Sequence, residues 1–224
     1  MAPLPDSVRS QKRRAAALAL VAGYIDSYTL LNYRVFASFM SGNTTQSGLN
    51  AGRGELLESG YHLLPIPLFM IGIIAGILIL HSGLRHAFRL LCALVAVLLA
   101  AALTADGFTR LGGWFTIMTL SLAMGVMNVT ITRVGGQPVS LGYVTGDLHH
   151  LAEHVALAIK RTALPAAQGL WDTHGQRAVH LTAVWAAFLM GAALSPIAWT
   201  HLAIWALLPP ILLLLAAAVS KPRP

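Results

Sequence analysis

The sequence predicts an all-α polytopic transmembrane helical bundle with six to eight membrane segments in two related halves. Of its 224 residues, 56% are hydrophobic and only 10% are charged, and the mean hydropathy is +0.69. A soluble domain usually carries about a quarter charged residues, so this chain cannot cover a water-facing surface. Eight stretches of about 20 apolar residues would use about 160 positions, which fits the length.

The charge pattern favours a membrane over a nucleic-acid partner. The net charge of +7 is carried by Lys and Arg residues that mostly flank apolar runs, where positive charge marks the cytoplasmic side. No basic stripe with interleaved aromatic residues is present, so we expect no nucleic acid as a partner. The one cysteine, Cys92, lies in an apolar run and predicts inert packing.

Charge-poor windows mark the expected segments. Four basic residues precede an apolar stretch at 15–33, which is too long for a signal peptide and predicts a first transmembrane helix with a cytoplasmic N-terminus. The last window is 43 residues long and predicts a hairpin of two spans that turns between Ser195-Pro196 and His201, with Pro209 and Pro210 inside the final span. The windows after the first are 35–52, 59–84, 90–105, 111–132, 138–158 and 178–220.

Two topologies remain open. If the polar-rich windows 35–52 and 138–158 cross the membrane, there are eight spans, with eleven Lys and Arg residues inside and four outside. If both windows dip in and return, there are six spans, with twelve inside and three outside. The positive-inside rule accepts both, and both place the two termini in the cytoplasm. The chain then divides into a tail, a first membrane repeat, a second membrane repeat and a second tail, at 1–14, 15–110, 111–220 and 221–224.

An internal repeat is indicated by two matching motifs. Ser41-Gly42-Asn43 recurs 104 residues later as Thr145-Gly146-Asp147, and at the same offset Gln46 falls on His150. Upstream, Gly23 to Asp26 parallels Gly125 to Asn128. Three spans per half would make the halves inverted and four would make them parallel; secondary transporters use both and bind substrate at the repeat interface.

The motif helices carry polar side chains on one face. Asn43, Gln46, Ser47 and Asn50 share a face in the first, and Asp147, His150 and His154 share one in the second. Lipid cannot satisfy such groups. They therefore line a solute or ion pathway, or they hydrogen-bond neighbouring helices. For the pathway, we expect the substrate-binding residues to be Ser41, Gly42, Asn43, Gln46, Thr145, Gly146, Asp147 and His150.

Asp26 is a costly residue because it lies in the middle of the first span. A buried carboxyl group either pairs with a cation or takes up a proton. Asp26 is therefore a candidate for proton coupling, with a static structural role as the alternative. Arg34 and Arg133, near segment ends, are its candidate partners.

A metal site is a weaker alternative. His150, Glu153 and His154 fit H-x-x-E-H, an inverted zinc-protease signature. A third ligand is not obvious, and the repeat already pairs His150 and His154 with Gln46 and Asn50. We expect no cofactor and, on balance, no enzyme activity. Small-residue faces at Gly72-x-x-x-Gly76 and Gly191-x-x-x-Ser195 predict helix packing within the chain.

The motifs Ala22 to Asp26, Phe39 to Asn43 and Tyr143 to Gly146 resemble those of the YoaK-type family of small bacterial membrane proteins, from about Ala15 to Val219. The resemblance implies a compact protein of the bacterial inner membrane that carries a domain of unknown function. It does not supply a substrate. The polar run from Asp147 to His150 departs from the family's pattern.

The leading functional prediction is transport of a small polar or anionic solute by alternating access. Its expected partners are the lipid bilayer, the solute and a second copy in a homodimer. The alternatives are a membrane-embedded metal-binding protein or hydrolase, and a non-transporting accessory subunit whose polar faces only join helices.

Overall fold

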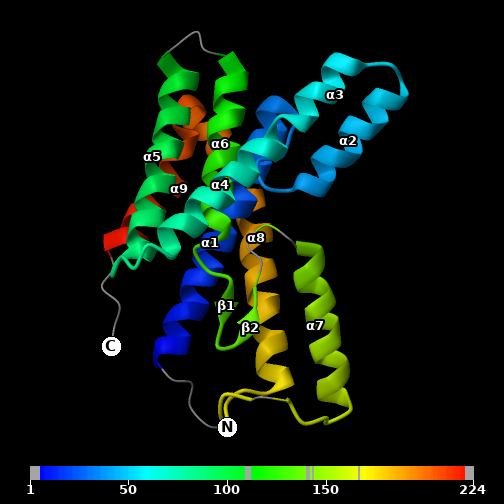
Figure 1. The fold of residues 1–224 in the computed structure, drawn as a ribbon, viewed down its shortest axis with the longest axis vertical. Helices are drawn as coiled ribbons and strands as arrows, with labels where there is room; N and C mark the ends of the chain where they lie inside the picture. The colour runs from blue at the N-terminus through cyan, green and yellow to red at the C-terminus, as the bar shows by residue number, and fades with distance from the viewer. Residues whose placement is uncertain (1–5, 109–111, 140–141, 143, 166, 220–224) are drawn as a thin grey trace.

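The protein is an all-α membrane protein with one small β-hairpin (Figure 1). The computed structural model describes residues 6–219 except 109–111, 140–141, 143 and 166. The elements in chain order are α1 (Asp6–Tyr33), α2 (Met40–Gly52), α3 (Leu56–Leu63), α4 (Pro65–Leu80), α5 (Ala87–Phe108), α6 (Gly112–Asn128), β1 (Arg133–Val134), β2 (Gln137–Pro138), α7 (Val144–Ile159), α8 (His174–Leu202), the short 3₁₀ helix η1 (Ala203–Leu207) and α9 (Leu208–Val219).

Two helix crossings without intervening side chains organise the bundle. Where α1 crosses α8, a Cβ on Gly23 would overlap the carbonyl oxygen of Phe188, and one on Gly191 would overlap that of Leu20. This contact has the close backbone approach that small residues permit in membranes.

The second crossing joins α4 and α6. A Cβ on Gly125 would overlap the carbonyl oxygen of Phe69, and one on Gly72 would overlap that of Leu122. The small-residue faces that begin at Gly72 and Gly191 therefore pack within the chain, as the sequence predicted.

Helix α5 joins the two crossings to the rest of the core. It packs against α6 on one side and α9 on the other. Fully buried side chains at its centre include Leu91 and Leu99, and they meet Leu120 of α6 and Leu207 of η1 in one apolar cluster. Cys92 is buried in this helix, in agreement with a packing role.

Three stretches of the described chain are long and apolar enough to cross a membrane: Leu56–Leu80, Ala87–Ala105 and His174–Val219. The first joins α3 and α4 through Leu64, whose backbone stays helical. Gly113–Asn128 is apolar but shorter. In α1, 28 residues long, four basic residues occupy the first half and the apolar sequence follows.

The turn of the last hairpin lies later than predicted. Helix α8 continues through Ser195 and Pro196 to Leu202, and the chain turns at Ala203, which has a positive φ of 47°. Pro209 and Pro210 begin α9 instead of kinking it. The first N–H groups of a helix have no intrahelical partner, so proline is tolerated there.

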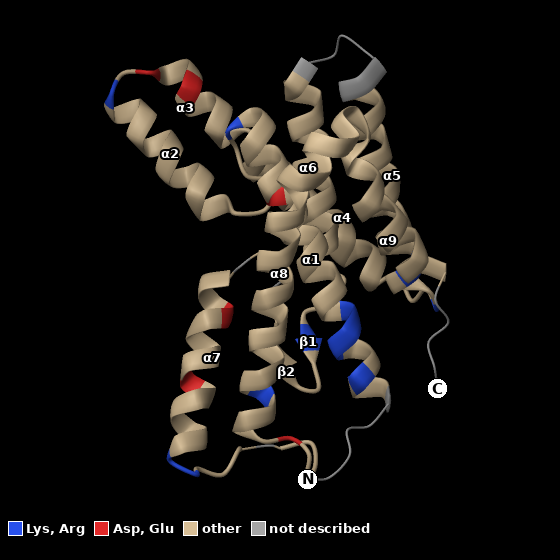
Figure 2. Cartoon of the chain, turned by 180° about the vertical axis from the view of Figure 1, so that it is seen from behind, with Lys and Arg blue, Asp and Glu red and all other residues tan. Residues whose placement is uncertain are grey.

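Helices α2 and α7 are shorter and project from opposite ends of the bundle (Figures 1 and 2). Neither continues directly into another helix, as α3 does into α4 and η1 into α9, so with 13 and 16 residues they extend about 20 and 24 Å, less than the roughly 30 Å of a bilayer core. Helix α2 packs mainly against α3, and α7 packs against α8.

Candidate functional site

The chain after α1 folds back onto that helix at Asp26. Arg34 adopts a positive φ of 60°, and the following residues return along the end of α1. Ser38 donates two hydrogen bonds to the Asp26 carboxylate, from its backbone N to Oδ1 and from its hydroxyl to Oδ2, both at 2.7 Å. The sequence offered Arg34 and Arg133 as partners, but these hydrogen bonds come from Ser38. No periodicity signals this contact, because it depends on the left-handed turn at Arg34.

Asn43 fixes the same returning segment to α2. Its Oδ1 accepts a hydrogen bond from the backbone N of Phe36 at 2.9 Å, and its Nδ2 donates to the carbonyl oxygen of Phe36 at 2.7 Å. The side chain is fully buried. Asn43 therefore positions the loop, and its amide is already occupied by the backbone.

A cavity of about 210 Å³ with both polar and apolar walls lies where α2 begins. Its walls come from the returning segment, α2, α4, α6 and the residue two positions before α7: Ser38, Phe39, Met40, Ser41, Phe69, Asn128 and Gly142. A Cβ on Gly142 would lie 2.9 Å from the Ser38 hydroxyl. The starts of α2 and α7, 104 residues apart, therefore approach each other here. Ser38, Phe69 and Gly142 were not predicted, since their distance along the chain hides this contact.

A second cavity of about 330 Å³ adjoins α2. It is lined by Phe36, Phe39, Ser41, Gly42, Thr45 and Gln46. Ser41 lines both cavities. Of the predicted binding residues on α2, Ser41, Gly42 and Gln46 face open space, whereas Asn43 braces the loop.

The polar face of α2 turns towards α3. Asn43, Ser47 and Asn50 are buried, but Gln46 is exposed, so the predicted stripe is narrower than expected. The hydroxyls of Ser47 and Ser59 lie 2.9 Å apart across the α2–α3 contact. This part of the stripe joins two helices.

The polar face of α7 turns towards α8. Asp147 and His154 are buried, and Nδ1 of His154 lies 2.9 Å from Nδ1 of His174. The two motif helices thus each pack on the helix that follows, and their stripes do not face each other. Thr145, Gly146, Asp147 and His150 line neither of the two cavities at α2.

The H-x-x-E-H residues are divided between two environments. His150 pairs with Glu153 at 3.3 Å on the surface, while His154 turns to His174 in the interior. Within the part of the chain that the structure describes, no group of three or more His, Cys, Asp or Glu side chains is placed to hold a metal ion. The geometry gives the metal-site alternative no support.

Ionisation on α7 follows from these contacts. The hydrogen bond from His150 holds the pKa of Glu153 below its ordinary value. Burial, and then the neighbouring His174, lower the pKa of His154. A neutral His154 can share one proton with His174, because one Nδ1 must donate and the other accept.

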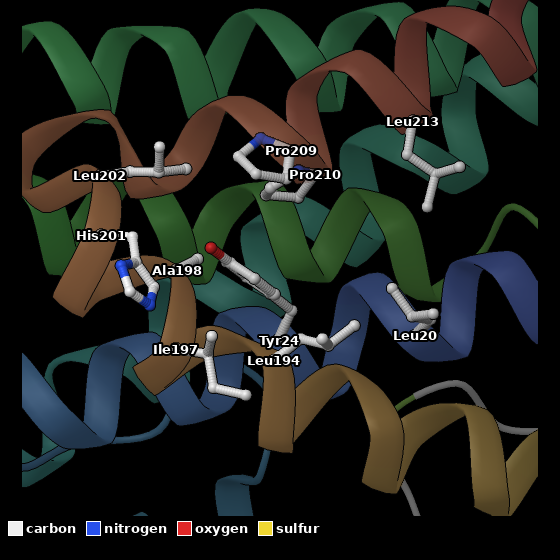
Figure 3. Close-up of a pocket in the computed structure, with 10 residues that line it drawn as sticks. All are labelled: Leu20, Tyr24, Leu194, Ile197, Ala198, His201, Leu202, Pro209, Pro210 and Leu213. Carbon is white, nitrogen blue, oxygen red and sulfur yellow. The ribbon is translucent and has the colours of Figure 1, made fainter.

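A larger cavity of about 540 Å³ opens between α8 and α9 over α1. Figure 3 shows the ring of Tyr24 reaching from α1 between side chains of α8 and α9. The hydroxyl of Tyr24 donates to the carbonyl oxygen of Ala206, and the wall is otherwise apolar except for His201. No Lys, Arg, Asp or Glu lines it, so this cavity suits hydrocarbon and not a polar solute.

Basic residues gather at one end of the molecule. Figure 2 shows those of α1, β1 and the start of α8 on the same side. Contacts agree: Arg14 lies over the Phe88 ring at the start of α5, and Gly135 donates a backbone hydrogen bond to Gln11. Among the described residues, Arg34 and Arg53 are the basic residues near the other end.

Comparison with known proteins agrees with this architecture. Residues 14–220 match the family described as "Protein of unknown function (DUF1275)". The chain is 31% identical over 208 residues to a UPF0700 transmembrane protein of Rhizobium meliloti, a match that covers 93% of this chain and 86% of the relative. No solved structure matches.

Proposed function

The chain belongs to the DUF1275 family of transmembrane proteins of unknown function, and from that premise we propose that it transports a small polar or anionic solute by alternating access. The observation that carries the proposal is the cavity at which the starts of α2 and α7 meet, because Ser38 in its wall hydrogen-bonds the buried carboxylate of Asp26.

The proposal includes a six-span topology. Helices α1, α3–α4, α5, α6, α8 and α9 cross the membrane, and the windows with α2 and α7 re-enter it. The gathering of basic residues at the end shared by the starts of α1, α5 and α8 supports a cytoplasmic location for that end. Both termini are then cytoplasmic, in a bacterial inner membrane.

We further propose that residues 15–110 and 111–220 are inverted repeats. Helix α1 contacts α8 through Leu20 and Gly23, and α6 contacts α4 through Leu122 and Gly125. In each helix the two contacting residues are three positions apart. The partner positions, 188 and 191 in α8 and 69 and 72 in α4, also share that spacing. Three spans per half give opposite orientations, an arrangement with a substrate site at the repeat interface.

The cavity's chemistry suits an anion or a polar solute. Phe39 precedes α2 without a side-chain cap, and the first turn of α2 contains no acidic residue. The dipole of α2 therefore favours negative charge beside Ser41. Asn128 adds an amide from α6. The predicted binding residues on α7 would reach the site only if α7 moves: Thr145, Gly146, Asp147 and His150. We propose that in the opposite-facing state of the transporter they take the place that Ser41 and its neighbours have here.

Asp26 is the proposed coupling group. Its carboxylate is buried and is joined to the cavity through Ser38, which contacts both. Protonation would remove the negative charge that strengthens both Ser38 hydrogen bonds and would loosen the loop that walls the cavity. This links proton uptake to the opening of the site.

Flux into proteoliposomes tests transport. We expect at least one solute from a panel of chloride, nitrate, formate, phosphate and glycerol to enter faster than into empty liposomes. Ser41→Trp, which would place a bulky ring where both cavities meet α2, should reduce that flux at least tenfold, whereas Thr44→Trp on the exposed face of the same helix should not. Equal flux in protein-containing and empty liposomes for the whole panel would exclude these solutes.

Coupling has a separate test. Asp26→Asn keeps an acceptor for the Ser38 N–H but cannot ionise, so flux should lose its response to a pH gradient. Glu58→Gln, the same change at an exposed carboxyl group on α3, serves as the control. An unchanged pH response in Asp26→Asn would leave transport standing and remove the coupling.

A non-transporting accessory subunit is the second candidate. The Ser47–Ser59 and His154–His174 contacts favour it, because they use the polar stripes to join helices. In that case Ser41→Trp would change no flux, and the protein would purify with another membrane protein.

We also propose that the transporter is a homodimer. The α2–α3 hairpin projects from the bundle (Figure 1), and Leu57 at its tip is 90% exposed. A second copy would cover this surface. Cross-linking of a Leu57→Cys variant, made in a Cys92→Ala background, should yield a dimer in membranes.

A further inference from the structure

A smaller groove of about 220 Å³ lies between α1, α5 and α9, away from the proposed solute site. Two arginines occupy one end and apolar side chains form the rest of the wall: Arg13, Arg14, Ala17, Leu18, Val21, Phe88, Leu213, Leu214, Ala216 and Ala217. No acidic residue lines it. The groove therefore has a cationic end and a hydrocarbon-like length.

In the proposed six-span topology, the cationic end lies at the surface of the membrane. Phe88 is the second residue of the apolar stretch Ala87–Ala105, and the guanidinium carbon of Arg14 lies 4.6 Å from the centre of its ring. Arg14 thus marks the depth at which α5 enters the bilayer. Ala17, Leu18 and Val21 continue from that level into the hydrocarbon region.

The contact with Phe88 also holds Arg14 in place. A cation over an aromatic face is electrostatically favourable, and a group already fixed before binding loses less conformational freedom when its ligand arrives. Arg13 is exposed beside it. Two adjacent guanidinium groups, one fixed and one free to adjust, match the oxygens of a phosphate.

We propose that this groove binds one anionic phospholipid, with its phosphate on Arg13 and Arg14 and an acyl chain along Leu18, Val21 and Leu214. A soluble anion would leave the apolar wall uncovered, and a zwitterionic lipid would bring a second positive charge to the arginines. Basic pockets between membrane helices on the cytoplasmic side recognise anionic headgroups in this way. The inference rests on the proposed topology but not on transport.

Lipid titration of the purified full chain tests the proposal. In detergent, phosphatidylglycerol should raise the melting temperature and remain bound in native mass spectrometry, whereas phosphatidylcholine with the same acyl chains should do so at least tenfold more weakly. At a given concentration, a ligand that binds the native state more tightly stabilises it more.

Three variants and one soluble probe make the result specific. Arg13→Gln with Arg14→Gln should abolish the preference for phosphatidylglycerol, whereas Lys160→Gln with Arg161→Gln, an equal charge change at the exposed end of α7, should retain it. Ala17→Leu narrows the groove but keeps both arginines. It should therefore weaken the binding of phosphatidylglycerol although the positive charge of the groove is unchanged. Glycerol 3-phosphate should bind at least tenfold more weakly than the lipid.

Two outcomes would overturn the inference. One is an unchanged lipid preference in the double arginine variant, and the other is equal stabilisation by glycerol 3-phosphate and the lipid. If the double variant does not fold, Ala17→Leu and the single Arg13→Gln variant still decide, because Arg13 is exposed and an intact lipid preference in both would contradict the proposal.

Discussion

Gly23 of α1 meets Phe188 of α8 backbone to backbone, and a Cβ at Gly23 would overlap the Phe188 carbonyl oxygen. Gly125 and Phe69 repeat this relationship between α6 and α4. Lipid tails are as apolar as leucine, so close contact of this kind takes the role in membranes that the hydrophobic effect has in water. The two crossings are therefore the contacts on which the packing of the bundle depends most.

Gly23→Ala and Gly125→Ala should each destabilise the protein by about 2 kcal/mol, because an added methyl group has nowhere to go and forces the backbones apart. Gly48→Ala is the matched control: its Cβ meets nothing within 4 Å, and alanine favours a helix by roughly 1 kcal/mol over glycine. Thermal unfolding in detergent measures all three. A loss at Gly48 equal to that at Gly23 would mean that the crossing is not the cause.

Tyr24→Phe should cost about 1 kcal/mol, because it removes the buried hydrogen bond to the Ala206 carbonyl oxygen and leaves that oxygen unpaired. The bond joins α1 to the turn before α9. Exchange of backbone hydrogens in η1 should therefore rise in the variant, while exchange in α4 stays at the wild-type level. An increase spread evenly over both regions would indicate a global effect.

Arg177→Gln should destabilise the protein by about 3 kcal/mol at pH 7, because it leaves the buried carboxylate of Asp172 without its partner. Arg53→Gln at an exposed site should have little effect. Thermal unfolding measures the stability of both variants, and the difference between them gives the contribution of the Asp172–Arg177 ion pair.

The Asp172–Arg177 ion pair also makes the free energy of unfolding depend on pH in the acid range. Burial alone would raise the pKa of Asp172, but the hydrogen bonds and charge of Arg177 outweigh it and hold the pKa below its ordinary value. The pair's contribution is thus complete above about pH 4 and falls as the pH drops through the lower folded-state pKa. The deficit of Arg177→Gln relative to wild type should shrink in that range. A deficit that stays constant down to pH 2 would contradict this assignment.

Acidification should loosen α7 from α8 at a higher pH. The folded-state pKa of His154 lies below its ordinary value through burial and the nearby His174, so protonation favours the state in which α7 has left α8. The contact is at full strength above about pH 6.5 and weakens as the pH falls from there to the folded-state pKa. Four groups act on His154: His174, Arg177, Glu153 and His150.

Hydrogen exchange in α7 at pH 7.5 and 5.5, corrected for intrinsic rates, measures this effect. Exchange should increase at pH 5.5 in the wild type and change less in His154→Gln, which cannot take a proton. His149→Gln, at an exposed position on the same helix, is the control. Equal pH responses in all three proteins would assign the opening to another group.

The sequence predicted the parts of the fold that composition and periodicity determine. Apolar windows identified the three stretches of the described chain that are long and apolar enough to cross a membrane, and the glycine patterns at 72 and 191 predicted contacts within the chain. The turn after α8 was misplaced because Ser195-Pro196 resembles a break, whereas proline inside a membrane helix is tolerated when neighbouring groups compensate. The actual turn depends on the positive φ of Ala203, which the sequence does not predict because alanine rarely adopts such a conformation.

The candidate site was predicted only in part. The Ser41-Gly42 motif does line cavities, and Asp26 is hydrogen-bonded to Ser38, which lines one of them. The sequence could not predict which helices the polar faces of α2 and α7 contact, since helical spacing defines a face but not the helix that packs against it. Ser38 and Gly142 were missed because they meet only after α1 and α6 have brought their loops together.

The partnership of α1 with α8 also constrains how the protein is made. Residues 174–202 leave the ribosome long after residues 6–33, so α1 is synthesised without its main neighbour. The residue that hydrogen-bonds its carboxylate, Ser38, lies only twelve positions after Asp26. The loop that closes on Asp26 can therefore form long before α8 is available.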